Sequence, residues 1–291
     1  MRILLDAKDL ISIVEHEQPV SREEFANYLQ KHDSQLVLSF ANVSEFVAPL
    51  ASPRDFLRMR RLLQDIQTLP VCYIREPPIP IEELRSALKA FDAGREFDPI
   101  DPYVQGWDET FHYPGPSAAQ MFVNYRLDEI VFTLWSNKPD IFRRPPGQTD
   151  RLRAVFAADR KLPRSVRKSL RKNFANTVRR HLALWSVSPP KASLNAFSDW
   201  IYSDPFRCPG LRLNYETFHE LLANLGDVPR DSDIPDFGYI NAIPYVEAAT
   251  LDRRIFHYCN TVSRKLCKLN STVNYTDYIF PGVQALLEAI P

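Results

Sequence analysis

Short apolar runs that end beside acidic residues constrain the fold of this chain most. Three such runs lie far apart: Ile3-Leu4-Leu5 before Asp6, Leu36-Val37-Leu38-Ser39 before Glu45, and Ala248-Ala249-Thr250-Leu251 before Asp252. Parallel strands deliver the residues after their carboxyl ends to one edge of a sheet, so we expect these acids to converge. Carboxylates that gather repel one another, and a divalent cation is the usual remedy. The pattern therefore indicates Mg²⁺ or Mn²⁺ chemistry on phosphates.

Strand-like and helix-like segments alternate at both ends of the chain. In the first 75 residues, the pattern predicts strands at 2–6, 35–40 and 69–74. The helices between them are predicted at 10–15, from the capping box at 21–24 onwards, at 42–49 and at 52–66. Near the other end, it predicts a strand at 247–251, a helix at 253–269, a strand at 277–281 and a helix at 283–289. This alternation is typical of an α/β fold with a parallel sheet and helices on its faces.

The middle of the chain, residues 76–225, has a different character. Proline-rich joints separate helix-like pieces at 81–91, 117–136, 165–185, 194–202 and 215–225. We therefore predict a discontinuous α/β domain made of residues 1–75 and 226–291, with residues 76–225 forming a large helical insertion.

Charge is distributed unevenly although the whole chain has a formal net charge of zero. Residues 143–180 hold thirteen lysines and arginines against two aspartates, which makes this basic segment +11 and the remainder −11. Such a separation indicates a part that faces a polyanion. The candidate nucleic-acid-binding residues are Arg164, Arg167, Lys168, Arg171, Lys172, Arg179 and Arg180. The alternative is a solvated helix face that balances the acidic remainder through another subunit or domain.

Several classes of function find no support in the sequence. No apolar run reaches the ~18 residues of a membrane span, and no signal-peptide core is present, so we expect a cytoplasmic protein without a membrane partner. The four cysteines form no Cys-x-x-Cys pair, which favours reduced packing residues. The eight glycines form no nucleotide-binding loop, so a nucleotide cofactor is not expected.

The ordered acids resemble those of PIN-domain nucleases. The opening Met1–Asp6, followed by Leu10-Ile11, is similar to the first strand and first metal-binding Asp of that family. Val37-Leu38-Ser39 followed by Glu45 is similar to its second acidic element. The block from Asp236 to Asp252, with the turn Thr250-Leu251-Asp252, resembles the region of the third and fourth acids.

This resemblance implies a three-layer α/β/α fold and Mg²⁺- or Mn²⁺-dependent hydrolysis of phosphodiester bonds, in RNA rather than DNA. It implies that Asp6 and Asp252 are metal ligands, that Asp236 holds a second or weaker metal, and that Glu45 is a ligand or orients one. All four residues are the candidate catalytic set of a two-metal-type endoribonuclease. A toxin-like role with an inhibitor protein, and a homo-oligomer, remain open.

Alternative interpretations of the same residues stay open at this point. An Asp after a strand is commonly the N-cap of the next helix, and Glu45 taken alone can be a surface acid. Lys8 could pair with a carboxylate and compete with a metal, which would leave an inactive PIN-like module that binds nucleic acid or a protein. For the third acid we favour Asp236 over Asp233, because it lies nearest the helical segment that follows.

Overall fold

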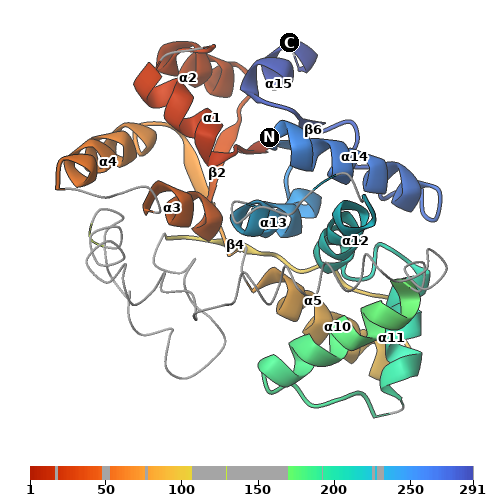
Figure 1. Cartoon of the computed structure of the whole chain (residues 1–291). Coiled ribbons are helices and arrows are strands. Elements are labelled where there is room, and N and C mark those ends of the chain that lie inside the picture. The colour runs from red at the N-terminus through yellow and green to blue at the C-terminus, as the bar shows by residue number, and fades with distance from the viewer. Residues whose placement is uncertain are drawn as a thin grey trace.

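A six-stranded sheet forms the centre of the protein (Figure 1). The computed structural model describes residues 1–16, 19–47, 53–75, 78–106, 129, 170–191, 193–224, 227 and 233–290. The strands are β1 (Arg2–Leu4), β2 (Gln35–Ser39), β3 (Val71–Ile74), β4 (Tyr103–Val104), β5 (Ala248–Thr250) and β6 (Ile279–Phe280). Their order is β4-β3-β2-β1-β5-β6, and every neighbouring pair is parallel except β3 with β4. The first strand in the sequence thus lies between segments from the two ends of the chain.

Successive residues of each strand point to opposite faces of the sheet, as the pleat of a strand requires. In β1, Ile3 belongs to the apolar core on one face and Leu4 to the core on the other, and both are fully buried. In β2, Leu36 and Leu38 pack into the first core and Val37 into the second. Strands buried on both faces explain why these runs are apolar throughout rather than alternating with polar residues.

Helices cover both faces of the sheet. The first core joins the sheet to α1 (Ala7–Ile11), the π-helix η1 (Ser12–His16), α2 (Arg22–Lys31), α3 (Phe40–Val47), α4 (Pro53–Ile66) and α15 (Val283–Ala289). The second core joins it to α13 (Asp233–Ala242), the 3-10 turn η3 (Ile243–Tyr245) and α14 (Arg253–Cys267). The expected mixed α/β architecture with a mostly parallel sheet is therefore confirmed.

The described part of residues 76–225 is mainly helical. It contains α5 (Ile79–Asp92), α10 (Leu170–Leu184), α11 (Leu194–Ser203) and α12 (Pro209–Ala223), which share a third apolar core (Figure 1). The same segment also supplies the edge strand β4, and α12 packs against α13 and α14. The helix expected at 117–136 lies outside the described residues except for Glu129. In the ranges that the structure describes, no helix is both long and apolar enough to cross a membrane.

Helix α12 begins at Pro209, earlier than the helix that the sequence pattern predicts from residue 215. Pro209 occupies the first turn of the helix, where its missing N–H is not needed. Cys208 before it adopts a left-handed conformation with φ of 67°. A Cβ added to Gly210 would lie 2.4 Å from the backbone oxygen of Asn241, so the glycine permits the close approach of α12 to α13.

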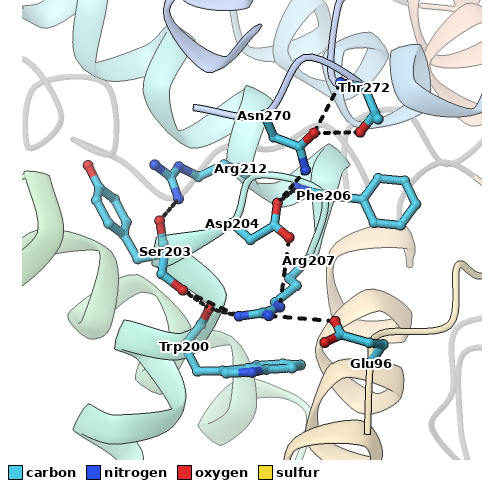
Figure 2. A network of polar contacts seen from close by, with 10 residues as sticks. Glu96, Trp200, Ser203, Asp204, Phe206, Arg207, Arg212, Asn270 and Thr272 are labelled. Atoms are coloured by element: carbon cyan, nitrogen blue, oxygen red, sulfur yellow. Dashed lines mark hydrogen bonds and ion pairs between the residues drawn. The ribbon is translucent and has the colours of Figure 1, made fainter. Parts of the chain in front are cut away.

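A polar network connects the helical part to the α/β part (Figure 2). In the turn between α11 and α12, the carboxylate of Asp204 accepts hydrogen bonds from the Phe206 backbone N–H at 3.0 Å and from Asn270 Nδ2 at 2.9 Å. Asn270 follows α14, which belongs to the sheet-covering layer. Arg207 lies over the ring of Trp200 at 4.2 Å and donates to the Trp200 backbone oxygen at 2.9 Å. The network fixes how this turn approaches the loop between α14 and β6.

Candidate functional site

Asp6 lies just beyond β1 and begins α1. Its side-chain Oδ1 accepts a hydrogen bond from the backbone N–H of Lys8 at 2.8 Å, so it is the N-cap of that helix. Its own backbone N–H donates to the hydroxyl of Thr250 at 2.9 Å, which ties the end of β1 to the end of β5. The residue is only 8% exposed. Local helix capping and a contact across 244 residues of sequence thus hold one carboxylate in a nearly buried position.

Glu45 on α3 belongs to a network of buried hydrogen bonds. Its Oε2 accepts a hydrogen bond from the hydroxyl of Tyr239 at 3.0 Å, and that hydroxyl accepts one from Asn42 Nδ2 at 3.1 Å. Asn42 Nδ2 also donates to the backbone oxygen of Leu5 at 2.9 Å, directly before Asp6. We call Asn42 and Tyr239 the Asn42–Tyr239 network; it connects the ends of β1 and β2 with α3 and α13.

The pKa values of both carboxyl groups are raised. Burial, and then the nearby charges of Asp9 and Asp252, raise the pKa of Asp6 from 3.8 to about 6 against the hydrogen bond from Lys8. Burial, and then the charge of Asp6, raise the pKa of Glu45 from 4.5 to about 7 against the hydrogen bond from Tyr239. Two carboxyl groups therefore resist ionisation together, as buried neighbours of like charge do.

Asp252 and Asp236 approach the same neighbourhood from other elements. Asp252 is exposed at the N-terminus of α14, where its Oδ1 accepts from the backbone N–H of Ile255 at 2.8 Å. Its charge contributes to the raised pKa of Asp6. Asp236 is half-buried in α13, and its charge is one of the causes that raise the pKa of Tyr239, after burial and the two carboxylates of the site. The helix begins at Asp233, whose side chain lies outside the described residues.

A fifth acid, Asp9, supports the site and was missed by the sequence interpretation. Burial raises the pKa of Asp9, while hydrogen bonds from the Thr250 hydroxyl and the Val283 backbone N–H oppose the rise. The same Thr250 oxygen accepts from the backbone of Asp6. Asp9 therefore connects α1 with β5 and with the start of α15. The sequence signal was present in the spacing, because Asp9 lies on the first turn after Asp6 and Thr250 two residues before Asp252.

The described residues contain no group of three or more His, Cys, Asp or Glu side chains close enough to hold a metal ion. Asp6 and Glu45 are instead a neighbouring pair that provides only oxygen donors, and the charge of Asp252 acts on Asp6. Mg²⁺ commonly takes one or two carboxylates and fills its other positions with water and substrate oxygens. The pair fits such an ion better than it fits a closed protein cage.

Lys8 does not occupy the space between the acids as an ion-pair partner. Its side chain is exposed, and within the described ranges it forms no salt bridge. Its charge lowers the pKa of Asp6, but it is the smallest of the causes that act on that group. Competition between this ammonium group and a cation therefore finds no support in the side-chain geometry.

The basic residues predicted to bind nucleic acid are described only in part. Arg164, Arg167 and Lys168 lie outside the described residues, and α10 includes Arg171 and Lys172 without a described side chain. Arg179 and Arg180 are exposed on α10, on the side away from the buried Phe174 and Val178. Of the seven basic residues expected to bind nucleic acid, the structure thus describes two side chains, and both are exposed.

The chain matches no protein-family model, no curated protein and no solved structure. The function is therefore inferred from the arrangement of these side chains.

Proposed function

We propose that this protein is a metal-dependent phosphodiesterase of PIN type that cleaves RNA at the edge of the sheet where β1, β2 and β5 end. One observation carries the proposal: Asp6 and Glu45, which lie 39 positions apart in the sequence, form a neighbouring pair of poorly exposed carboxyl groups with raised pKa values. Holding two such carboxyl groups beside each other costs the folded state free energy. A cation relieves both the repulsion and the cost of burial.

The residues of the site have distinct roles in this proposal. Asp6 and Glu45 hold a Mg²⁺ or Mn²⁺ ion, and Asp252 completes the negative rim from the start of α14. Asp236 on α13, whose charge acts on Tyr239 of the Asn42–Tyr239 network, attracts a second, weaker ion. A bound divalent ion supplies the activation of water and the neutralisation of charge on the phosphate. Capping uses one oxygen of Asp6 and one of Asp252, which leaves the second oxygen of each for a ligand.

The alternative is an inactive PIN-like module that binds nucleic acid or a protein partner. The feature that favours it is the absence, in the described part of the chain, of three acids at metal-binding distance. In that case the carboxyl pair would stay partly protonated at neutral pH, and the basic face of α10 would be the working surface. The two functions separate in one assay.

The assay incubates the protein with labelled single-stranded RNA in Mn²⁺, in Mg²⁺ and in EDTA. Three variants remove a single charge with little change in shape: Asp6→Asn, Glu45→Gln and Asp252→Asn. Asparagine remains an effective N-cap, so α1 and α14 are expected to form in both aspartate variants. Asp98→Asn, at an exposed position, is the matched control.

Cleavage that needs the divalent ion, is lost in the three site variants and persists in Asp98→Asn would support the nuclease. Cleavage that survives Asp6→Asn would point to a contaminating enzyme and would sink the proposal. If no metal gives cleavage and RNA binding remains salt-sensitive, the interaction module is the correct function.

A further inference from the structure

Helix α4 exposes a stripe of arginines that the sequence interpretation did not use. Arg54, Arg58 and Arg61 follow one another at helical spacings of four and three residues, so they lie on one face of the helix, and all three are exposed. Leu57 lies within the same stripe and is 56% exposed, so it places an apolar side chain among the three cations. The opposite face, with Met59, packs into the first core. We call Arg54, Leu57, Arg58 and Arg61 the α4 stripe.

The acids near this stripe are already engaged. Glu15 of the π-helix η1 accepts two hydrogen bonds from the Arg58 guanidinium, one of them at 2.7 Å. Asp65 pairs with Arg22 of α2 at 2.6 Å. In the described ranges, Arg54 and Arg61 have no ion-pair partner. The two ends of the stripe therefore present guanidinium groups that are available to an anion.

A hollow lies beside the stripe, between η1 and α4. Its volume is about 570 Å³, and it is lined by Val14, Glu15, Arg58, Arg61, Leu62 and Asp65. Arg58 is held in place there by its two hydrogen bonds to Glu15, while Arg61 borders the same space. The apolar side chains give the hollow a surface for a flat or apolar group next to the positive charge.

The direction of α4 places the stripe relative to the candidate site. In a parallel sheet, the connection after β2 starts at the edge where the strands end and must return to the opposite edge before β3. Because α4 leads into β3, Arg54 in its first turn lies at the end of the helix away from the start of that strand, and Arg61 lies about 10 Å further along the helix axis. Helices α1, α3 and α4 share one core on the same face of the sheet.

We propose that the α4 stripe binds the phosphate backbone of a single-stranded nucleic acid that runs from the candidate acid site along α4; this extends the proposed function by naming the path of its substrate. Guanidinium groups match phosphate oxygens in pairs, and they remain charged at any working pH. Leu57 and the apolar wall of the hollow contact a base face. The basic segment at 143–180 is not required for this path.

The test measures RNA binding without cleavage. A fluorescent single-stranded RNA of mixed sequence is titrated with protein in EDTA, and the dissociation constant is followed by anisotropy between 50 and 400 mM salt. The variant is Arg54→Gln with Arg61→Gln, which leaves the Arg58–Glu15 contact intact. The matched control, Arg95→Gln with Arg264→Gln, removes two exposed arginines that lie away from α4.

The stripe variant is expected to bind about tenfold more weakly near 0.15 M salt, with the slope of log K against log salt reduced by about 1.4, that is ~0.7 for each lost contact. The control is expected to bind like the parent. Equal slopes for the stripe variant and the control overturn the proposal, as does an absence of binding by the parent.

An acidic protein partner is the competing occupant of the stripe. Polyglutamate that displaces the RNA at equal charge concentration, and loses this ability in the stripe variant, would assign the stripe to such a partner and overturn the proposal. The result is independent of catalysis. Binding that depends on the stripe, without cleavage in any metal, would refute the nuclease function and leave the stripe as a nucleic-acid site.

Discussion

Replacing Asp6 by asparagine is expected to stabilise the protein at neutral pH when divalent ions are absent. The pKa of Asp6 rises from 3.8 to about 6 on folding, and this difference of about two pKa units corresponds to about 3 kcal/mol. Asparagine keeps the N-cap to the Lys8 N–H and carries no charge, so it avoids this cost. The loss of the Asp6 charge also relieves Glu45, whose pKa that charge raises.

The size of the effect depends on pH in a defined way. Below about pH 3.8, Asp6 is protonated in both the folded and the unfolded chain, and its burial costs no charge. Between about pH 4 and 6, the unfolded chain releases the proton while the folded protein keeps it, so the stability of the parent falls as the pH rises. Above pH 6 the full cost is present. The advantage of Asp6→Asn is thus near zero at acidic pH and largest at pH 7.5.

Thermal and urea unfolding of the parent and Asp6→Asn in EDTA, at pH 4, 5.5 and 7.5, measure this difference. At pH 7.5 the variant is expected to unfold roughly 5–10 °C higher. Asp98→Asn, at the surface, is the control for loss of one negative charge. An Asp6→Asn variant that is less stable than the parent at pH 7.5, or a difference that does not shrink towards pH 4, would refute the reasoning from burial.

Three other changes have clear expected outcomes. Addition of 5 mM Mn²⁺ is expected to raise the melting temperature of the parent at pH 7.5 but not at pH 5, where Asp6 is protonated. The melting temperature of Asp6→Asn is expected to stay unchanged at both pH values. Equal shifts of the parent at both pH values would contradict metal binding by Asp6. Tyr239→Phe removes a hydrogen bond that lowers the pKa of Glu45, so Mn²⁺ binding by calorimetry is expected to need a higher pH, together with a stability loss of about 1–3 kcal/mol. Gly210→Ala is expected to lower the free energy of unfolding in urea by about 2 kcal/mol or more, because the new Cβ meets a backbone oxygen. Gly94→Ala is expected to lower it by about 1 kcal/mol, because the space around Gly94 is open and only its positive φ is a strain.

The sheet could be predicted from the sequence because its strands are buried on both faces. Such strands appear as continuous apolar runs, and β1, β2 and β5 all fall within the predicted ranges. The capping box from Ser21 to Glu24 is equally local, and both of its hydrogen bonds are present. Strand β4 escaped prediction because two residues in a proline-rich segment join the sheet by backbone pairing alone, without an apolar pattern of their own.

The candidate site was predictable only where a residue follows a strand. Asp6 and Asp252 could be found in this way, although the same position made each of them a helix cap, as the alternative interpretation held. The Asn42–Tyr239 network could not be found, since its two members are 197 residues apart and each looks ordinary in its own segment. Long-range hydrogen bonds of this kind depend on the packing of α3 against α13, which periodicity does not encode.

The position of β1 between β2 and β5 also bears on when this protein becomes competent during translation. The hydrogen bond from the Asp6 backbone N–H to the Thr250 hydroxyl spans 244 residues. At about 5–20 residues per second, the ribosome needs on the order of 10–50 s to supply the second neighbour of the first strand. Until then, one edge of β1 has no partner and is exposed to chaperones or to other nascent chains. Asp236 and Asp252 emerge in the same late interval. The candidate site therefore cannot assemble before the ribosome has supplied this late segment.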